Sequence, residues 1–221
     1  MSASIRLDSA VGIPLRDGVL TRAELWRDGA EGRPRPTILV RTPYGRRTHF
    51  HQFPIDPQAA HQRGFNLLIQ DVRGRGDSDG VLTPFVQEGP DGVDTLDWIV
   101  ARPWSDGRVV MMGPSYVGAT QWLLAAQRHP ALRAIAPMNS SPFLGESWFY
   151  RNGVREHEFI VSWIATSFAA QADQRPDDVE ALFNATPAQV GELLPAGQDW
   201  LTRSVDDPSW AALSVDPGAL G

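Results

Sequence analysis

The 221-residue sequence contains no cysteine and no lysine. Without cysteine, the chain cannot form disulfide bonds, thiolate metal sites or a cysteine nucleophile. Without lysine, it cannot use a lysine nucleophile or a Schiff base. All 20 basic residues are arginines, and 26 acidic residues leave a net charge of −6. That balance provides no basic face for a phosphate backbone, so we expect no nucleic-acid partner.

Long apolar runs are also missing from the sequence. No stretch approaches the ~18 consecutive apolar residues of a membrane-spanning helix. The first residues, Met1–Arg6, lack the apolar segment of a secretory signal. We therefore expect a soluble, cytoplasmic protein without a membrane partner.

The apolar pattern predicts strands that alternate with helices. An N-terminal hairpin is expected over Ile5–Pro14 and Val19–Trp26, joined by Arg16-Asp17-Gly18, and its charged residues favour the edge of a sheet. The further expected elements are strands Ile38–Arg41, Asn66–Gln70, Val109–Met112 and Ala134–Met138, with helices Asp91–Val100 and Tyr116–Gln127. Such alternation predicts an α/β fold with a largely parallel sheet.

The composition changes after Pro142, where aromatic residues become frequent. They are Trp148, Phe149, Tyr150, Phe159, Trp163 and Phe168. We expect a helical excursion here rather than more sheet, followed by short helices over Asp177–Phe183 and Pro187–Leu194 and a short segment that begins at Asp206.

A serine motif, Gly113-Pro114-Ser115-Tyr116-Val117-Gly118, joins a predicted strand to a predicted helix. A serine on such a sharp turn exposes its hydroxyl as a nucleophile, and the helix directs N–H groups at a developing anion. Small residues at the two glycines let the backbones pass closely. The match to G-x-S-x-G is imperfect, because Val117 occupies the second glycine position and Gly118 follows one place later.

Two other patterns are typical of cofactor or metal sites. The glycine-rich segment Gly74–Gly80 follows a predicted strand, as a dinucleotide-binding loop does, but Val81–Pro84 does not open a helix. Two aspartate pairs lie at predicted helix starts: Asp91 with Asp94, and Asp177 with Asp178. Carboxylates at helix starts favour the helix dipole, so we expect no cofactor and no metal.

Several ordered segments together resemble the serine-hydrolase family that contains cocaine esterase and the Xaa-Pro dipeptidyl-peptidases, the CocE/NonD type. They are Arg16-Asp17-Gly18, Val40-Arg41-Thr42-Pro43-Tyr44, Gln70-Asp71-Val72-Arg73-Gly74, Thr95-Leu96-Asp97-Trp98-Ile99, Trp104-Ser105-Asp106-Gly107 and the serine motif. The family's motif is G-x-S-Y-x-G, which accounts for the displaced glycine. The resemblance implies an α/β-hydrolase fold, with its N-terminal core over residues 1–142 and an inserted helical cap over residues 143–221.

The resemblance also implies roles for individual residues. Ser115 would be the nucleophile, while the backbone N–H of Tyr116 and the phenolic O–H of Tyr44 would form the oxyanion hole. This agrees with the chemistry, since a tetrahedral intermediate needs donors that converge on one oxygen. Trp148 and Trp163 match positions that wall the acyl pocket, although aromatic residues at such spacing also pack in cores.

These roles predict a serine hydrolase that cleaves ester or amide bonds, of the acyl or Xaa-Pro dipeptidyl kind, through an acyl-enzyme. Its substrate would be a small ester or a short peptide. Family members complete the triad with an aspartate and a histidine on strands downstream of the cap, and this chain ends near Gly221, before those strands. Neither His129 nor His157 occupies a position that the family uses. The alternative is a truncated or degenerate hydrolase that at most binds ligands or partners.

One further expectation concerns assembly. In the family, more strands follow the one that corresponds to Ala134–Met138. Without them, that strand would leave an open sheet edge, which is a template for self-association.

Overall fold

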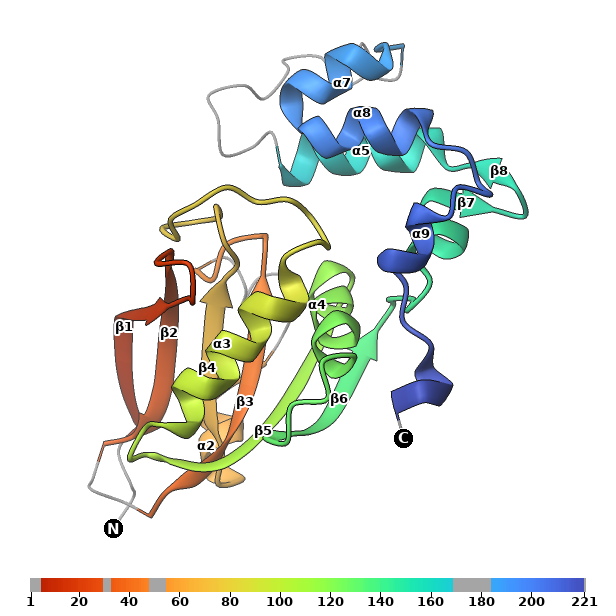
Figure 1. The fold of residues 1–221 in the computed structure, drawn as a ribbon. Coiled ribbons are helices and arrows are strands. Elements are labelled where there is room, and N and C mark those ends of the chain that lie inside the picture. The colour runs from red at the N-terminus through yellow and green to blue at the C-terminus, as the bar shows by residue number, and fades with distance from the viewer. Residues whose placement is uncertain (1–4, 30–32, 48–54, 169–183, 221) are drawn as a thin grey trace. The chain divides into compact units, whose positions relative to one another are not determined.

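The computed structural model describes residues 5–29, 33–47, 55–168 and 184–220. The chain divides into two compact units, Met1–Ser140 with Gly218–Gly221, and Ser141–Pro217 (Figure 1). The domain assignment made from the sequence, a core over 1–142 and a cap over 143–221, stays a prediction, since compactness alone does not define a hydrolase core or a cap.

The first unit is built on a six-stranded sheet in the order β1-β2-β4-β3-β5-β6. The strands are β1 (Ile5–Pro14), β2 (Leu20–Asp28), β3 (Arg35–Thr42), β4 (Asn66–Asp71), β5 (Ser105–Pro114) and β6 (Leu132–Met138). The hairpin β1–β2 and the β2–β4 pair are antiparallel, and the remaining neighbours are parallel. The predicted α/β fold with a mostly parallel sheet and a hairpin at its edge is confirmed.

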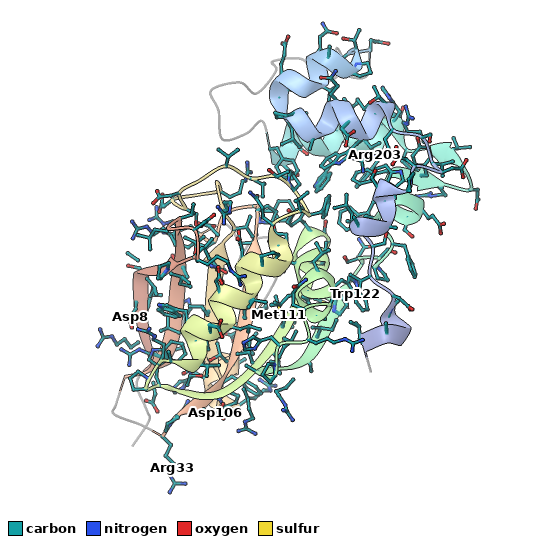
Figure 2. All side chains as sticks on the ribbon, in the orientation of Figure 1. Asp8, Arg33, Asp106, Met111, Trp122 and Arg203 are labelled. Atoms are coloured by element: carbon teal, nitrogen blue, oxygen red, sulfur yellow. The ribbon has the colours of Figure 1, made fainter. Side chains whose placement is uncertain are left out.

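Helices cover both faces of this sheet because its central strands are apolar on both sides. The helices are α2 (Pro57–Gln62), α3 (Glu88–Val100) and α4 (Tyr116–Ala125). One core cluster joins the sheet to α3 and α4, which lie side by side in Figure 1, and includes Leu39, Leu68, Leu96, Met111 and Leu124. The alternate strand residues meet α2 in a second cluster that includes Val40, Ala60, Leu67 and Ile69. Figure 2 shows Met111 in the interior and Asp8 at the outer edge of the unit.

Several elements extend beyond their predicted bounds. β3 and β5 begin at Arg35 and Ser105, before their apolar runs, because these two residues pair with each other in the parallel ladder. α3 begins three residues before Asp91, at Glu88. α2 was not predicted, since a helix of only six residues carries little periodicity.

The second unit has the helical segments expected after Pro142. Apart from the 3₁₀ helix η3 (Pro217–Leu220), whose residues from Gly218 onward belong to the first unit, they are the π-helix η1 (Gly145–Phe149), α5 (His157–Ser167), α7 (Pro187–Leu193), α8 (Pro195–Thr202) and α9 (Ser209–Ala212). An unpredicted hairpin of β7 (Tyr150–Arg151) and β8 (Val154–Arg155) interrupts them, and its turn residues Asn152 and Gly153 have the positive φ that tight hairpins require. The predicted helix Asp177–Phe183 lies outside the described residues. In the part of the chain that the structure describes, no helix is both long and apolar enough to span a bilayer.

Candidate active site

Ser115 occupies the turn between β5 and α4. Its φ of 56° and ψ of −132° are strained for a residue with a side chain. Backbone hydrogen bonds hold this conformation: the Ser115 N–H donates to the Met138 carbonyl at 3.0 Å, and the Ser115 carbonyl accepts from Gly118 at 2.8 Å and Ala119 at 3.1 Å. The structure thus has the sharp strand-to-helix turn that the serine motif predicts.

The two glycines of the motif are explained by close packing. Gly113 has a φ of 140°, and a Cβ there would lie 2.4 Å from Val117 Cγ1. A Cβ at Gly118 would lie 2.4 Å from Ser140 Cβ, just beyond the end of β6. Position 118, rather than 117, is therefore where α4 comes too close to its neighbour for a side chain.

Gln121, which the sequence analysis did not single out, stabilises the turn through hydrogen bonds of its side chain. Its buried amide donates to the carbonyls of Gly113 and Val117, each at 3.1 Å. Its Oε1 accepts from the Ala136 N–H at 3.0 Å. One side chain therefore joins β5, α4 and β6 beneath Ser115. In the sequence, this role of Gln121 was indicated only by the position of a polar residue within the largely apolar helix α4.

Tyr44 lies in the loop that follows β3, and its side chain reaches the nucleophile turn. The phenolic oxygen is 3.0 Å from Ser115 Oγ, a hydrogen bond in which either atom can donate. The Tyr44 N–H donates to Thr42 Oγ1 at 3.1 Å, which tightens the loop at the end of β3. The structure therefore brings together two predicted site residues that are 71 positions apart.

Tyr116, the first residue of α4, turns its side chain away from the sheet surface into the core. Its phenol donates to Glu88 Oε1 at 2.8 Å and accepts from the Phe85 N–H at 3.0 Å. Burial, and next the charge of Glu88, raise the pKa of Tyr116 well above its usual value, so the phenol stays protonated. Only the backbone of Tyr116 can then serve the oxyanion hole, as the resemblance implies. The first N–H groups of a helix have no acceptor inside that helix.

A buried ion pair lies behind Tyr116. Arg41 Nη2 is 3.0 Å from Glu88 Oε2, and Arg41 also donates to the Glu88 carbonyl at 2.6 Å and to Gln70 Oε1 at 3.1 Å. Burial raises the pKa of Glu88, and the charge of Arg41 opposes that rise. The network links β3, β4, α3 and the start of α4. In the sequence, this network was indicated only by Arg41 and Gln70, a charged and an amide residue within predicted apolar strands.

The described histidines of the first unit have other partners than Ser115. His129 Nε2 is 3.0 Å from Asp97 Oδ1, and its Nδ1 accepts from the Ala131 N–H at 3.1 Å. His129 follows the C-terminal end of α4, whereas Ser115 precedes its N-terminal end. His61, on α2, lies 3.9 Å from Asp28.

Trp148 and Trp163 belong to the second unit, where both are buried. Their ring centroids are 5.6 Å apart, and each also contacts the half-exposed Phe159. Trp163 further stacks on Trp200 at 5.8 Å, and Trp200 stacks on Phe149 at 4.8 Å. Both tryptophans therefore pack in the aromatic core of their own unit. The pocket-wall role given to them from the sequence stays a prediction.

Comparison with known proteins identifies relatives of this fold and motif. The model of the X-Pro dipeptidyl-peptidase (S15) family matches residues 17–218. Cocaine esterase from Rhodococcus sp. (strain MB1 Bresler) is 34% identical over an alignment 235 positions long, which covers 94% of this chain and 40% of that enzyme.

Solved structures show the same fold. A CocE/NonD family hydrolase from Staphylococcus aureus superposes with a TM-score of 0.75 at 19% identity, covering 100% of this chain and 42% of that one. An aminopeptidase from a marine sediment Thaumarchaeota archaeon gives a TM-score of 0.61 at 25% identity, over 76% of this chain and 31% of that one. The chain thus spans less than half the length of these proteins.

Proposed function

Because the chain belongs to the X-Pro dipeptidyl-peptidase (S15) family, we propose that it carries the nucleophile and oxyanion-hole part of a serine hydrolase that cleaves ester or amide bonds. The observation that carries this proposal is the 3.0 Å contact between Tyr44 Oη and Ser115 Oγ at a strained strand-to-helix turn. A hydroxyl nucleophile and a phenolic donor meet there, as acyl transfer requires.

In the proposed reaction, Ser115 Oγ attacks the substrate carbonyl carbon while a general base takes its proton. The carbonyl oxygen becomes an oxyanion that accepts hydrogen bonds from the Tyr44 phenol and the Tyr116 backbone N–H. Collapse of this intermediate breaks the ester or amide bond, and the alcohol or amine leaves with a proton. The acyl group stays on Ser115 until water hydrolyses it.

No general base for Ser115 is identified among the described residues of the first unit. His129 is held by Asp97 and Ala131 at the far end of α4, so it does not supply the base. We propose that the histidine and its aspartate lie outside the 221 residues, as the resemblance implies. No cofactor enters the scheme.

The substrate class is proposed from the relatives. The relatives include an esterase and an aminopeptidase, so we propose small esters or short peptides as substrates. Trp148 and Trp163 are buried beside the exposed Phe159, which both rings contact. Their proposed role is to wall the acyl pocket.

The test uses the protein expressed from its complete reading frame. A panel of aryl esters, amino-acid esters and Xaa-Pro amides should reveal hydrolysis of at least one class. Ser115→Ala should lower kcat by about 10⁶, and Ser209→Ala, at an exposed serine, should leave it unchanged. Hydrolysis by Ser115→Ala at the wild-type rate would overturn the proposal.

A further inference from the structure

The loop that carries Tyr44 is held on both sides by the end of β4 and the segment that follows it. Ahead of Tyr44, Arg75 Nε donates to the Pro43 carbonyl at 2.7 Å. After it, the Arg46 N–H donates to the carboxylate of Asp71, the last residue of β4. Both anchors are buried charged side chains. Tyr44 and Gly45 lie between the two anchored positions, and Tyr44 is the one with a side chain.

Arg75 itself stands on a tightly closed turn. The Arg75 N–H donates to the Val72 carbonyl at 3.1 Å, and the Arg75 carbonyl accepts from Ser78 at 2.9 Å. The glycines on either side, Gly74 and Gly76, have φ values of 67° and 56°. A Cβ at Gly74 would lie 2.6 Å from the Leu82 backbone nitrogen. The sequence pattern that suggested a dinucleotide loop is thus the pattern of a turn that fixes an arginine.

The hydrogen bond from Arg75 to the Pro43 carbonyl requires a buried guanidinium, which is energetically unfavourable to desolvate. Arg75 is only 6% exposed, and a guanidinium withdrawn from water is unfavourable unless its donors are satisfied. Burial lowers the pKa of Arg75, and the charge of Asp71 opposes that fall. A charge-assisted hydrogen bond is stronger and better oriented than a neutral one. It ends on the carbonyl one residue before Tyr44.

We propose that Arg75 is a positioning residue for Tyr44, and that its Nε–H bond to the Pro43 carbonyl keeps the Tyr44 phenol on Ser115 Oγ. The catalytic consequence rests on the proposed function, whereas the positioning itself does not. Two effects of Arg75 must be separated: the hydrogen bond from Nε, and the positive charge near the two tyrosines.

Two substitutions separate them. Arg75→Gln places the amide Nε2 where Arg75 has Nε, so it keeps a donor and removes the charge. Arg75→Lys places a methylene at that position, so it keeps the charge and removes the donor. Arg75→Met removes both. Arg108→Gln is the matched control, since the Arg108 side chain is exposed and pairs with the neighbouring Asp106.

The first readout does not depend on activity. The chain has three tyrosines, Tyr44, Tyr116 and Tyr150, so 3-fluorotyrosine labelling gives three ¹⁹F resonances, and Tyr44→Phe identifies that of Tyr44. Arg75→Lys and Arg75→Met should shift the Tyr44 resonance by more than its linewidth. Arg75→Gln and Arg108→Gln should leave it in place. The resonance of Tyr116, which is buried in the core of the first unit, reports by its separation from the unfolded position whether that unit is folded in each variant. If Arg75→Met does not fold, the Gln and Lys variants decide.

The second readout is kinetic and uses the complete enzyme. Arg75→Lys should lower kcat with little change in KM, by at most the about 10²–10³-fold expected for losing one oxyanion donor. In a Tyr44→Phe background it should have no further effect, because both changes remove the same interaction. An unmoved Tyr44 resonance in Arg75→Lys, or a resonance moved by Gln and not by Lys, overturns the proposal. Absence of any hydrolysis would overturn the proposed function and leave the NMR result to decide the positioning.

Discussion

Among single residues, Ser115 and Tyr44 are the ones proposed to carry the chemistry, and their surroundings explain why they meet. Ser115 is held in a strained conformation by backbone hydrogen bonds to Met138, Gly118 and Ala119. Strain of this kind costs about 1–3 kcal/mol and persists only where neighbours enforce it. The hydroxyl is thereby fixed at the end of β5, within hydrogen-bond distance of the phenol of Tyr44 from the loop after β3.

The oxyanion role of Tyr44 gives a direct prediction. In the protein expressed from its complete reading frame, Tyr44→Phe should lower kcat by about 10²–10³, as the loss of one oxyanion donor does. The ring still packs, so the melting temperature should change little. Tyr150→Phe is the control, since the Tyr150 hydroxyl hydrogen-bonds with Arg203 and Arg155 of the second unit. An unaltered kcat in Tyr44→Phe would remove Tyr44 from the oxyanion hole.

Part of this site could be predicted from the sequence, and part could not. The serine motif is local, so its turn followed from a few neighbouring residues. Tyr44 came from the family resemblance, and no local pattern places it beside Ser115. Gln121, Glu88 and Arg75 were missed because their roles depend on partners far away in the chain.

At the scale of helices and strands, the apolar runs predicted which elements exist better than where they begin. The runs in β3 and β5 mark only the parts of those strands that are buried on both faces, and the ladder continues to Arg35 and Ser105. The sheet order, with β4 between β2 and β3, depends on pairing between strands that the sequence does not reveal. Helix α2 was missed because it is a single short segment with one buried residue, Ala60.

The ion pair between β3 and α3 provides a stability prediction. Glu88→Gln keeps an acceptor for Tyr116 but leaves the buried Arg41 without a carboxylate, so it should destabilise the fold by about 3–5 kcal/mol. Asp106→Asn breaks an exposed pair with Arg108 and should have little effect.

Urea denaturation measures this difference, with the eight tryptophans as fluorescent probes and the protein kept at submicromolar concentration. Equal midpoints for Glu88→Gln and the wild type would show that the Arg41–Glu88 pair contributes nothing to the stability of the fold. A lowered midpoint together with an unchanged slope would identify the loss as one of stability alone.

For the molecule as a whole, β6 ends the sheet. Within the described residues no strand pairs with its outer edge, and Ala134, Ala136 and Met138 are exposed. An open edge of this kind favours pairing with another chain. We predict that the 221-residue chain self-associates at micromolar concentration.

Light scattering coupled to size-exclusion chromatography tests this prediction. Ala134→Lys places a charge on the edge and should shift the chain toward monomer. Val86→Lys adds the same charge at an exposed site in the first unit and should not. A sharp monomer peak for the unmodified chain, with cooperative melting, would count against association through β6.

The last prediction concerns the reactivity of Ser115 in this chain alone. A serine without its histidine loses about 10⁶ in kcat, because an unassisted hydroxyl is a poor nucleophile at neutral pH. In the described part of the first unit, the contacts of His61 and His129 lead to Asp28 and Asp97 rather than to Ser115. The 221-residue chain should therefore give no acyl-enzyme burst with p-nitrophenyl acetate and no labelling of Ser115 by a fluorophosphonate, whereas the complete protein should give both. Stoichiometric labelling of Ser115 in the 221-residue chain would show that a base lies within its own sequence.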